Sequence, residues 1–310
     1  MPSRRKLVAI VGPTAVGKTA LSLALAGEFC GEIISADSRQ IYRRMDIGTA
    51  KVTGAERAQA PHHLIDIADP DETVTLGQYR TLAAAALEET WEREHLPLVV
   101  GGSGLYVRAL LEGWTVPEVP PNEELRQALY LEVQQQGEQL LHRWLSALDP
   151  EAAERIDGRN VRRVIRALEV TLETGVPITQ LQRRIDPGYT ALWLGLTLSR
   201  DALYRRIDAR VDRMVSAGLV DEVACLLASG YGEHLPAMSG LGYRQVVAFL
   251  AGRITLEEAI EQVKYQTHQF VRQQYNWFRL SDPRIHWLDA SGDVTEQARC
   301  LVHSFLVDAP

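Results

Sequence analysis

The sequence has few cysteines and no long apolar run. Its 310 residues contain three cysteines, Cys30, Cys225 and Cys300, which lie far apart and include no C-x-x-C pair. This odd, dispersed set excludes a disulfide framework and a cysteine-ligated zinc site, and it predicts a reduced protein of the cytoplasm. No segment approaches the roughly 18 consecutive apolar residues of a membrane-spanning helix, so we expect no membrane partner.

Excess basic charge is also missing. The chain has 33 lysines and arginines against 40 acids, a formal net charge of −7. This balance argues mildly against nucleic-acid binding over the whole surface, but it does not exclude a local basic patch. A hydrophobic content of 46% with 24% charged residues predicts a large buried core and not a disordered chain.

The strongest motif that is present is GPTAVGKT, residues 12–19. A strand-like run, KLVAIV, precedes it and a helix-like run, ALSLALAGEF, follows, which is the setting of a G-x-x-x-x-G-K-[ST] phosphate loop. Its backbone amides would surround phosphate oxygens, Lys18 would neutralise their charge, and the Thr19 hydroxyl would ligate Mg²⁺. The predicted phosphate site comprises Gly12, Pro13, Thr14, Ala15, Val16, Gly17, Lys18 and Thr19.

Strands and helices alternate in the first part of the chain. We expect strands at residues 6–11, 32–35, 64–67 and 96–100, and helices at 19–29 and 76–94. Such alternation predicts a parallel sheet with helices on both faces, whose ligands bind at the carboxyl ends of the strands.

The pattern changes after Trp114, where a polar, proline-rich segment, TVPEVPPNEE, begins. Only helices are expected beyond it, at residues 123–136, 137–147, 151–155 and 160–173. A strand at 190–199 and helices at 201–228 and 255–280 then resume the first pattern. We therefore predict an α/β core of residues 1–115 and 189–310, interrupted by an all-helical insertion of residues 116–188.

The acid that a nucleoside triphosphatase carries after a second buried strand is missing here, because LPLVV ends in GGSGLY. Asp37 instead follows the strand at 32–35, at the sheet edge beside the phosphate loop. That position suits a general base, but Asp-Ser sequences also cap helices, and both interpretations stay open. Ser103, in the second glycine-rich turn, either binds substrate or simply begins a helix.

Arginines gather in the predicted insertion. Residues 155–184 contain seven arginines against three acids, and four of them, Arg159, Arg162, Arg163 and Arg166, are expected on one helix face. Such a stripe suits nucleic-acid phosphates, although a solvated face paired with acids is the alternative. A second set, Arg206, Arg210 and Arg213, alternates with Asp208 and Asp212, which indicates either surface ion pairs or an arginine reaching the phosphates.

These motifs occur together in one family. GPTAVGKT, IISADSRQIY, DIGTAK, PHHLIDI, VVGGSGLY, RVIRALEV, GLGYRQ and a closing WFR follow one another in order, so that the sequence resembles tRNA dimethylallyltransferases from Lys6 to about Trp287. The resemblance implies a P-loop kinase-like core with an inserted helical domain that grips the tRNA anticodon stem-loop. We expect the protein to be a monomer.

The family transfers a dimethylallyl group from dimethylallyl diphosphate to N6 of adenosine 37, 3′ to the anticodon. The resemblance therefore implies that residues 12–19 hold the diphosphate with Mg²⁺ and that Asp37 is the general base. Ser103 stands where the family usually has a Thr or Ser that touches the target nucleotide. The chemistry also needs cations on the leaving diphosphate, and we expect Lys18 and Arg210 to provide them. The tRNA-contacting positions that the resemblance implies are Asp37, Ser38, Arg39, Gln40, Ser103, Arg126, Arg162, Arg163, Val164, Ile165, Arg166, Ser239, Gly240, Leu241, Gly242, Tyr243, Arg244 and Arg272.

The sequence departs from the family at one notable place. A Lys-Arg-Gln run is common before the closing Trp, whereas this chain has Arg272, Gln273 and Gln274, so the phosphate contact expected at the second position is in doubt. The phosphate loop alone also fits an ATP-dependent small-molecule kinase. The long helical insertion with its arginines disfavours that alternative.

Overall fold

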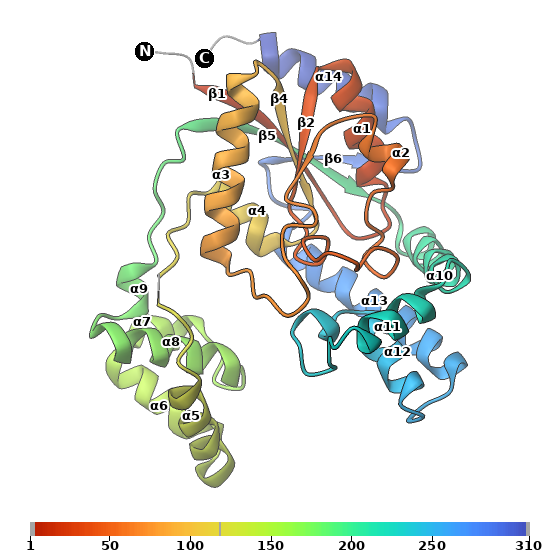
Figure 1. Ribbon diagram of the computed structural model, residues 1–310. Helices are drawn as coiled ribbons and strands as arrows, with labels where there is room; N and C mark the ends of the chain where they lie inside the picture. The colour runs from red at the N-terminus through yellow and green to blue at the C-terminus, as the bar shows by residue number, and fades with distance from the viewer. Residues whose placement is uncertain (1–3, 118, 308–310) are drawn as a thin grey trace. The chain divides into compact units, whose positions relative to one another are not determined.

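A six-stranded, wholly parallel sheet organises the protein within residues 4–117 and 119–307, the part of the chain that the computed structural model describes. The strand order is β3-β2-β4-β1-β5-β6 (Figure 1). The strands are β1 (Arg5–Val11), β2 (Gly31–Ser35), β3 (His62–His63), β4 (Leu96–Gly101), β5 (Tyr189–Thr197) and β6 (Ile285–Asp289). The predicted α/β fold with a parallel sheet is therefore confirmed.

The central strand β1 lies between β4 and β5, with Val8 aligned to Leu98 on one side and to Leu192 on the other. The strand that follows the helical segment thus returns to the middle of the same sheet. Because all strands run in one direction, the segments that follow β1, β2 and β4 emerge at one edge. The phosphate loop, Asp37 and Ser103 lie on these segments.

Helices cover both faces of the sheet, as the alternation of side chains along β1 requires. Val8 and Ile10 pack on one face against α1 (Lys18–Glu28), α10 (Arg200–Ser216), α13 (Leu256–Trp277) and α14 (Val294–Val307). Leu7, Ala9 and Val11 pack on the other against α3 (Leu76–Glu92) and α4 (Gly104–Leu111). Both sets of β1 side chains are fully buried.

A separate hydrophobic cluster lies outside these two layers. It joins Ile41, Tyr42 and Met45, from the segment after β2, to α11 (Leu219–Ala228), the short 3₁₀ helix η1 (Ala237–Ser239) and α12 (Tyr243–Leu250). The segment that carries Asp37 is thereby anchored to α11 and α12 as well as to the sheet. A short helix, α2 (Gly54–Arg57), follows on the same connection.

Two expectations about the elements were wrong, and two elements were not predicted. Residues 64–67 form no strand, because Leu64 and Asp66 adopt left-handed backbone conformations, with φ of 62° and 58°, that end the extended run at His63. The helix expected over 201–228 is two helices, since Gly218 has a φ of 100° and separates α10 from α11. Strand β6 and helix α14 were not foreseen.

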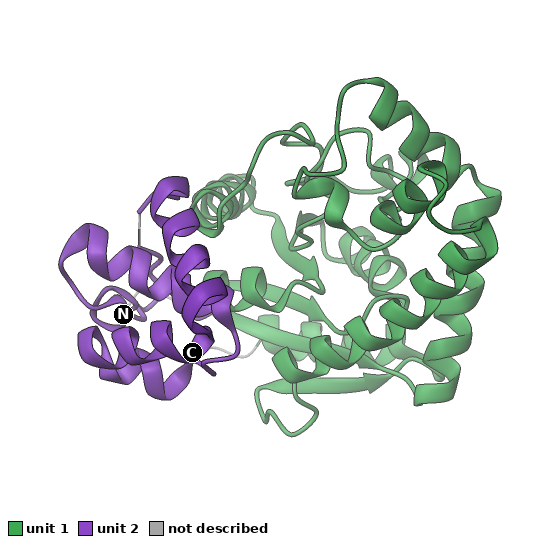
Figure 2. Ribbon diagram, turned by 90° about the horizontal axis from the view of Figure 1, so that it is seen from below, with its two compact units in different colours: residues 1–111, 188–310 green, residues 112–187 purple. Residues whose placement is uncertain are grey.

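The chain divides into two compact units (Figure 2), residues 1–111 with 188–310 and residues 112–187. The smaller unit, called here the helical unit, contains α5 (Glu123–Gln136), α6 (Glu138–Leu148), α7 (Pro150–Arg155), α8 (Val161–Thr174) and α9 (Ile178–Leu181). It has its own core, in which Leu141, Leu145 and Leu168 are buried. No helix in the described part of either unit is long and apolar enough to cross a membrane.

Candidate active site

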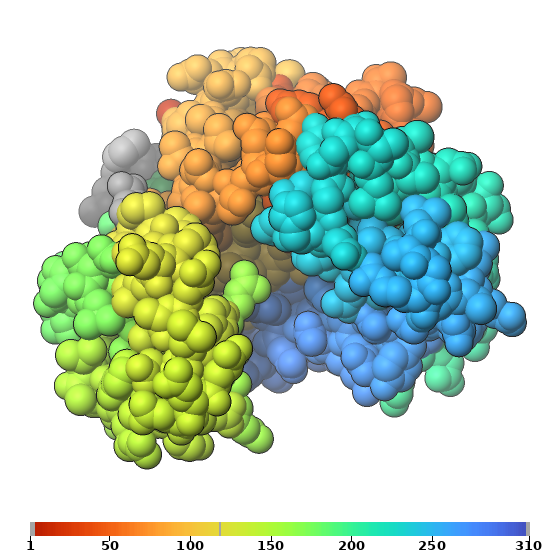
Figure 3. Space-filling model, turned by 60° about the horizontal axis from the view of Figure 1, so that its bottom comes forward, coloured from red at the N-terminus to blue at the C-terminus, as the bar shows by residue number. Residues whose placement is uncertain are grey.

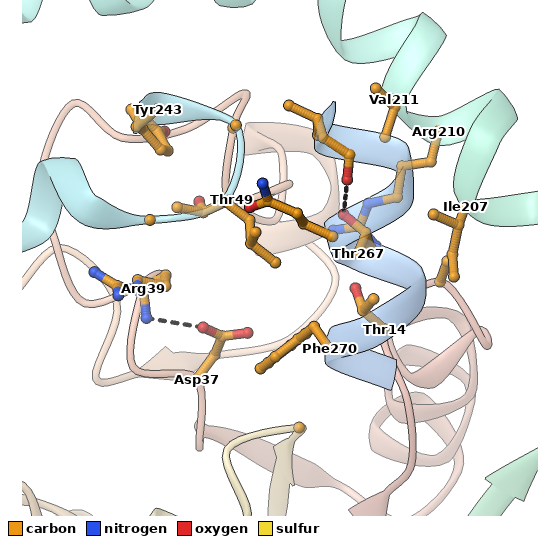
Figure 4. A pocket seen from close by; sticks show the side chains of 18 of the residues that line it. Thr14, Asp37, Arg39, Thr49, Ile207, Arg210, Val211, Tyr243, Thr267 and Phe270 are labelled. Carbon is orange, nitrogen blue, oxygen red and sulfur yellow. Dashed lines mark hydrogen bonds between the residues drawn. The ribbon is translucent and has the colours of Figure 1, made fainter. Parts of the chain in front are cut away.

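A cavity of about 600 Å³ lies in the larger unit at the carboxyl edge of the sheet. Its walls come from the phosphate loop, the segment after β2, the turn before α4, and helices α10 and α13 (Figure 4). Residues 239–244, which join η1 to α12, complete it, and the segments from α11 to α13 lie side by side on one face of this unit, from cyan to blue in Figure 3. The cavity therefore brings together the separate motifs of the sequence.

In the phosphate loop, the Lys18 side chain is bound by the loop's own backbone. The Lys18 ammonium group donates hydrogen bonds to the carbonyl oxygens of Gly12, at 3.0 Å, and Pro13, at 2.7 Å. Gly12 has a φ of 138°, and a Cβ there would lie 2.5 Å from the Leu196 carbonyl oxygen, so no other residue fits. Thr14, Ala15 and Lys18 line the cavity.

The remaining loop residues are not among those that line the cavity in the described chain. The Val16 side chain is buried in the core, and its carbonyl oxygen accepts a hydrogen bond from Arg206 at 3.1 Å. The Val16 side chain therefore does not face the cavity, and a phosphate contact at this position, through its backbone N–H, stays a prediction. Thr19 lies in the first turn of α1 and is partly exposed.

Lys18, Asp37 and Arg210 form an electrostatically coupled group. Burial lowers the pKa of Lys18 to about 8, while the Asp37 carboxylate acts in the opposite direction and Arg210 adds to the lowering. Burial likewise lowers the pKa of Arg210, and Asp37 again opposes the shift. Two cations and one carboxylate thus face the same space, which leaves a net positive charge for an anionic ligand.

Asp37 does not cap a helix, so that interpretation is wrong. One of its carboxylate oxygens accepts the backbone N–H of Arg39 at 2.8 Å within a turn, and no helix begins there. The carboxylate lines the cavity, as Figure 4 shows. This geometry leaves the other oxygen available to a ligand.

Ser103 ties the turn before α4 to the segment that carries Asp37. Its hydroxyl oxygen accepts the backbone N–H of Ser38 at 3.0 Å, and its own N–H donates to the Ala36 carbonyl oxygen at 3.2 Å. Ser103 also lines the cavity and directly precedes α4. Ser103 therefore stands at the start of α4 and faces the cavity, and its contact with substrate stays a prediction.

The three arginines of α10 differ in their surroundings. Arg210 lines the cavity and forms no hydrogen bond or ion pair with any described residue, and Figure 4 shows its side chain reaching toward Thr267. Arg206 and Arg213 donate to backbone carbonyl oxygens. The ion pairs expected among these arginines are absent from the described residues, because Asp208 pairs with His268 and Asp212 with Lys264 of α13, both at 2.8 Å.

Most residues of the segments 37–39 and 239–244 surround the same cavity. Ser38, Arg39, Ser239, Gly240, Leu241, Gly242, Tyr243 and Arg244 all line it. Gln40 does not, because its amide group donates to the carbonyl oxygens of Thr49 and Ala50. Arg39 donates to the carbonyl oxygens of Pro236 and Ala237, and thereby holds the two segments together.

Tyr243 has a structural role that its sequence motif does not reveal. Its buried hydroxyl donates to Glu222 at 2.6 Å. The same carboxylate accepts three successive backbone N–H groups, those of Asp46, Ile47 and Gly48, at 2.7 to 3.1 Å. The phenol hydroxyl is thus bound to the loop that follows β2, and the assignment of Tyr243 as an RNA contact stays a prediction.

Arg272 lies outside the cavity. Its guanidinium group donates to the Tyr204 hydroxyl at 3.2 Å on the exposed surface, whereas Phe270, Gln273 and Gln274 of the same helix line the cavity. The side chain therefore points away from the other predicted contacts, because successive residues of a helix face different directions.

The helical unit uses two of its predicted tRNA contacts internally. Arg126 and Arg166 both bind the fully buried carboxylate of Glu169, at 2.8 and 2.6 Å. Burial alone would raise the pKa of Glu169. The hydrogen bonds from Arg126, Arg166 and the backbone N–H of Asn122 outweigh this effect and lower the pKa. These two arginines hold the unit together, and their assignment as tRNA contacts stays a prediction.

The predicted arginine stripe is therefore shorter than expected. Val164 and Ile165 are buried in the core of the unit, so their side chains cannot face RNA. Arg159 precedes α8 and pairs with Asp157 at 2.6 Å. Arg162 and Arg163 are exposed and form no ion pair within the described residues.

Replacing Glu169 with Gln is expected to lower the free energy of unfolding of the helical unit by about 2 kcal/mol, because two arginines lose their buried anionic partner. Urea unfolding followed by circular dichroism would measure the loss. The control is Glu124→Gln, an exposed glutamate at the start of α5. Equal urea midpoints for the two variants would show that the Glu169 cluster does not stabilise the unit.

Comparisons with known proteins connect this arrangement to one family. The model of the IPP transferase family matches residues 40–281, and that of the isopentenyl transferase family matches residues 5–66. The tRNA dimethylallyltransferase of Thermomicrobium roseum is 53% identical over 94% of this chain and 88% of its own length. That of Roseiflexus sp. is 52% identical over 97% of this chain and 98% of its own length.

Solved structures of the same family resemble this chain as well. The tRNA isopentenylpyrophosphate transferase of Bacillus halodurans is 42% identical with a TM-score of 0.72, covering 98% of this chain and 96% of its own. A eukaryotic dimethylallyltransferase, captured acting on tRNA, is 26% identical with a TM-score of 0.83, covering 99% of this chain and 80% of its own. These matches confirm the P-loop kinase-like fold and give no support to the small-molecule kinase alternative. The chain belongs to the tRNA dimethylallyltransferase family of prenyltransferases.

Proposed function

We propose that this protein transfers a dimethylallyl group from dimethylallyl diphosphate to N6 of adenosine 37 in tRNA and releases diphosphate. The observation that carries the proposal is the meeting of Lys18, Asp37 and Arg210 in one cavity. A phosphate loop with two cations suits a leaving diphosphate, and a carboxylate opposite them suits a base acting on an amine.

The chemistry follows from these groups. The adenine N6 atom forms a bond to C1 of the allyl group while the bond from C1 to the diphosphate oxygen breaks. The N6 proton passes to the Asp37 carboxylate, which compensates for the weak nucleophilicity of an amine whose lone pair is delocalised into the ring. Lys18, Arg210 and the loop amides stabilise the negative charge on the departing diphosphate. The target base must leave its stack to reach this site.

The apolar part of the cavity supports a prenyl donor over a nucleotide. Ile207 and Val211 of α10 and Val263 and Phe270 of α13 line it. In Figure 4 the Phe270 ring is seen between Asp37 and Thr14 of the phosphate loop. We propose that the dimethylallyl group packs against these side chains, which exclude water from the reacting carbon.

The donor set near the phosphate loop also fits Mg²⁺, which needs few protein ligands when its substrate carries phosphates. The Thr19 hydroxyl forms no hydrogen bond within the described residues. No cluster of three His, Cys, Asp or Glu side chains suited to a metal occurs among them, so an ion would depend on diphosphate oxygens. We propose that Thr19 holds Mg²⁺, which when bound would neutralise part of the diphosphate charge.

For tRNA, we propose that the anticodon stem-loop uses Arg39 and Arg244 at the cavity and Arg162 and Arg163 on the helical unit. Arg39 and Arg244 line the cavity, and the other two are exposed. All the residues of the proposed reaction come from one chain, which supports a monomeric enzyme. The dispersed cysteines and the tRNA substrate support a cytoplasmic location.

The proposal is tested by incubating the protein with dimethylallyl diphosphate, Mg²⁺ and a tRNA that carries adenosine 36 and 37. We expect release of diphosphate that requires tRNA, together with a mass increase of one dimethylallyl group on adenosine 37. A tRNA with guanosine at position 37 is the matched control. ATP turnover without prenylated product would refute the proposal.

Lys18 gives the reaction a predictable pH dependence. Burial lowers the pKa of Lys18 to about 8. Lys18 is therefore mostly protonated below that pH and mostly neutral above it. We expect kcat/KM for the donor, which reports ionisations of the free enzyme, to fall as the pH rises through about 8. Lys18→Arg, whose guanidinium does not titrate in this range, should remove this decline. The same decline in both proteins would assign it to another group.

A further inference from the structure

Gln274 connects the two glycine-rich loops of the site. It lies on α13 with only 4% of its surface exposed. Its side-chain oxygen accepts the Thr14 N–H at 2.9 Å, and its amide nitrogen donates to the Gly102 carbonyl oxygen at 3.0 Å. One buried amide group therefore bridges the phosphate loop and the turn before α4.

The bridge continues to the segment that carries Asp37. Ser103, next to Gly102, bonds the backbone of Ala36 at 3.2 Å and that of Ser38 at 3.0 Å. Asp37 lies between these two residues. An unbroken chain of hydrogen bonds and short backbone links thus runs from the phosphate loop, through Gln274, to both neighbours of Asp37.

The position of Gln274 is itself tightly set. A Cβ on Gly102 would lie 2.3 Å from the Gln274 amide nitrogen, and one on Gly104 would lie 2.2 Å from the Trp277 ring. Arg108 of α4 donates to the Trp277 carbonyl oxygen at 2.6 Å. The last turns of α13 are thus seated against the turn before α4 with no room for adjustment.

We propose that Gln274 is a positioning residue that sets the separation between the phosphate loop and Asp37. Under the proposed function, on which this inference rests, that separation fixes where the base stands relative to the leaving diphosphate. Transfer requires N6, C1 and the leaving oxygen to be aligned, and a misplacement of about 1 Å costs on the order of 100-fold in rate. Gln274 contributes through the two loops, without touching the reacting atoms.

The sharpest test is Gln274→Glu, which keeps the size of the side chain. A carboxylate can accept the Thr14 N–H, but it cannot donate to the Gly102 carbonyl oxygen and repels it. Protonation restores the donor. We expect kcat to fall about 10–100-fold at pH 8, with the donor KM changed far less, and the ratio of variant to wild-type kcat to rise as the pH is lowered.

Two further variants complete the test. Gln274→Met lacks both hydrogen bonds, so its loss should not depend on pH. Gln262→Glu makes the same change at an exposed position of α13 outside the cavity and should behave as wild type. If Gln274→Glu keeps full kcat, or loses activity equally at every pH as Gln274→Met does, the positioning role is wrong.

Folding and the proposed function are controlled separately. Thermal melting identifies a variant that does not fold, and Gln274→Asn then replaces Gln274→Glu. Its amide is one methylene shorter and cannot reach both loops, so a lower kcat is expected and full kcat overturns the inference. Wild-type protein that fails to prenylate tRNA refutes the proposed function. Active wild-type protein with an unaffected Gln274 variant refutes only the inference.

Discussion

Asp37→Asn is expected to lower the rate of prenyl transfer by about 10²–10⁴-fold, the usual contribution of a general base. The amide oxygen of Asn can still accept the Arg39 N–H that Asp37 binds at 2.8 Å, so the turn should persist. What is lost is the negative, basic group in the cavity. Single-turnover transfer of the dimethylallyl group to tRNA, with the protein in excess, measures this loss directly.

Binding separates this expectation from a simple loss of structure. We expect tRNA affinity, measured by filter binding, to remain within a few-fold of wild type. Asp37 also raises the pKa of Lys18, so its replacement lowers that pKa further, and the comparison belongs at a pH well below 8, where protonation of Lys18 is favoured in both proteins. The matched control is Asp71→Asn, at an exposed position outside the cavity. Near wild-type transfer by Asp37→Asn would exclude Asp37 as the base.

The parts of the site that the sequence predicts are those that local patterns determine. Lys18, Asp37 and Ser103 each follow a short buried strand, and parallel strands bring their carboxyl ends to one edge. Periodicity and strand order are therefore enough to place these three residues together. The sequence pattern alone does not single out Arg210, because helical spacing groups it with Arg206 and Arg213. Only the packing of α10 shows which of the three arginines faces the cavity.

The residues that sequence reasoning missed act through distant partners. Gln274 meets Thr14 across 260 positions of the chain, and Glu222 meets Gly48 across 174. Neither has a local signal, since a glutamine or glutamate on a helix is ordinarily exposed. Apart from the Tyr243 hydroxyl on Glu222, their partners are backbone N–H and C=O groups, which nearly every residue possesses, so pairing of side-chain types gives little indication of them.

The prediction of an exposed arginine stripe on the helical unit was only partly right, for a related reason. Counting charges gave a basic stripe, but the count did not show that Glu169 is buried. One signal was available: Glu169 stands between Leu168 and Val170, and it follows Arg166 by three positions, the spacing of an ion pair along a helix. An acid within an apolar helix segment indicates a buried anion that nearby arginines must neutralise.

The cavity is built between structures that are anchored separately. The sheet and its helices hold Lys18 and Ser103, whereas the cluster of Ile41, Met45, α11 and α12 holds the far end of the segment that carries Asp37. Glu222 reinforces this second anchor by binding three backbone amides of residues 46–48. The phosphate end and the base end of the site are thus fixed by different cores, with Ser103 and Gln274 connecting them.

Arg210→Gln is expected to lower kcat by about 10²–10³-fold, the effect of removing one preorganised group that stabilises transition-state charge. Arg210 lines the cavity without a protein partner among the described residues, so its loss leaves no buried group unpaired and should not destabilise the fold. Negative charge grows on the diphosphate as its bond to C1 breaks, so the effect should appear mainly in kcat and less in the donor KM.

Arg213→Gln is the matched control, because Arg213 lies one turn further along α10, is exposed, and donates only to the Ala209 carbonyl oxygen among the described residues. Arg210→Lys should recover part of the activity, since it restores the charge but not the planar, forked donor that matches a diphosphate. Arg210 also lowers the pKa of Lys18, so Arg210→Gln should move the decline of kcat/KM to higher pH. An unchanged pH profile together with a kcat equal to that of Arg213→Gln would place Arg210 outside the reaction.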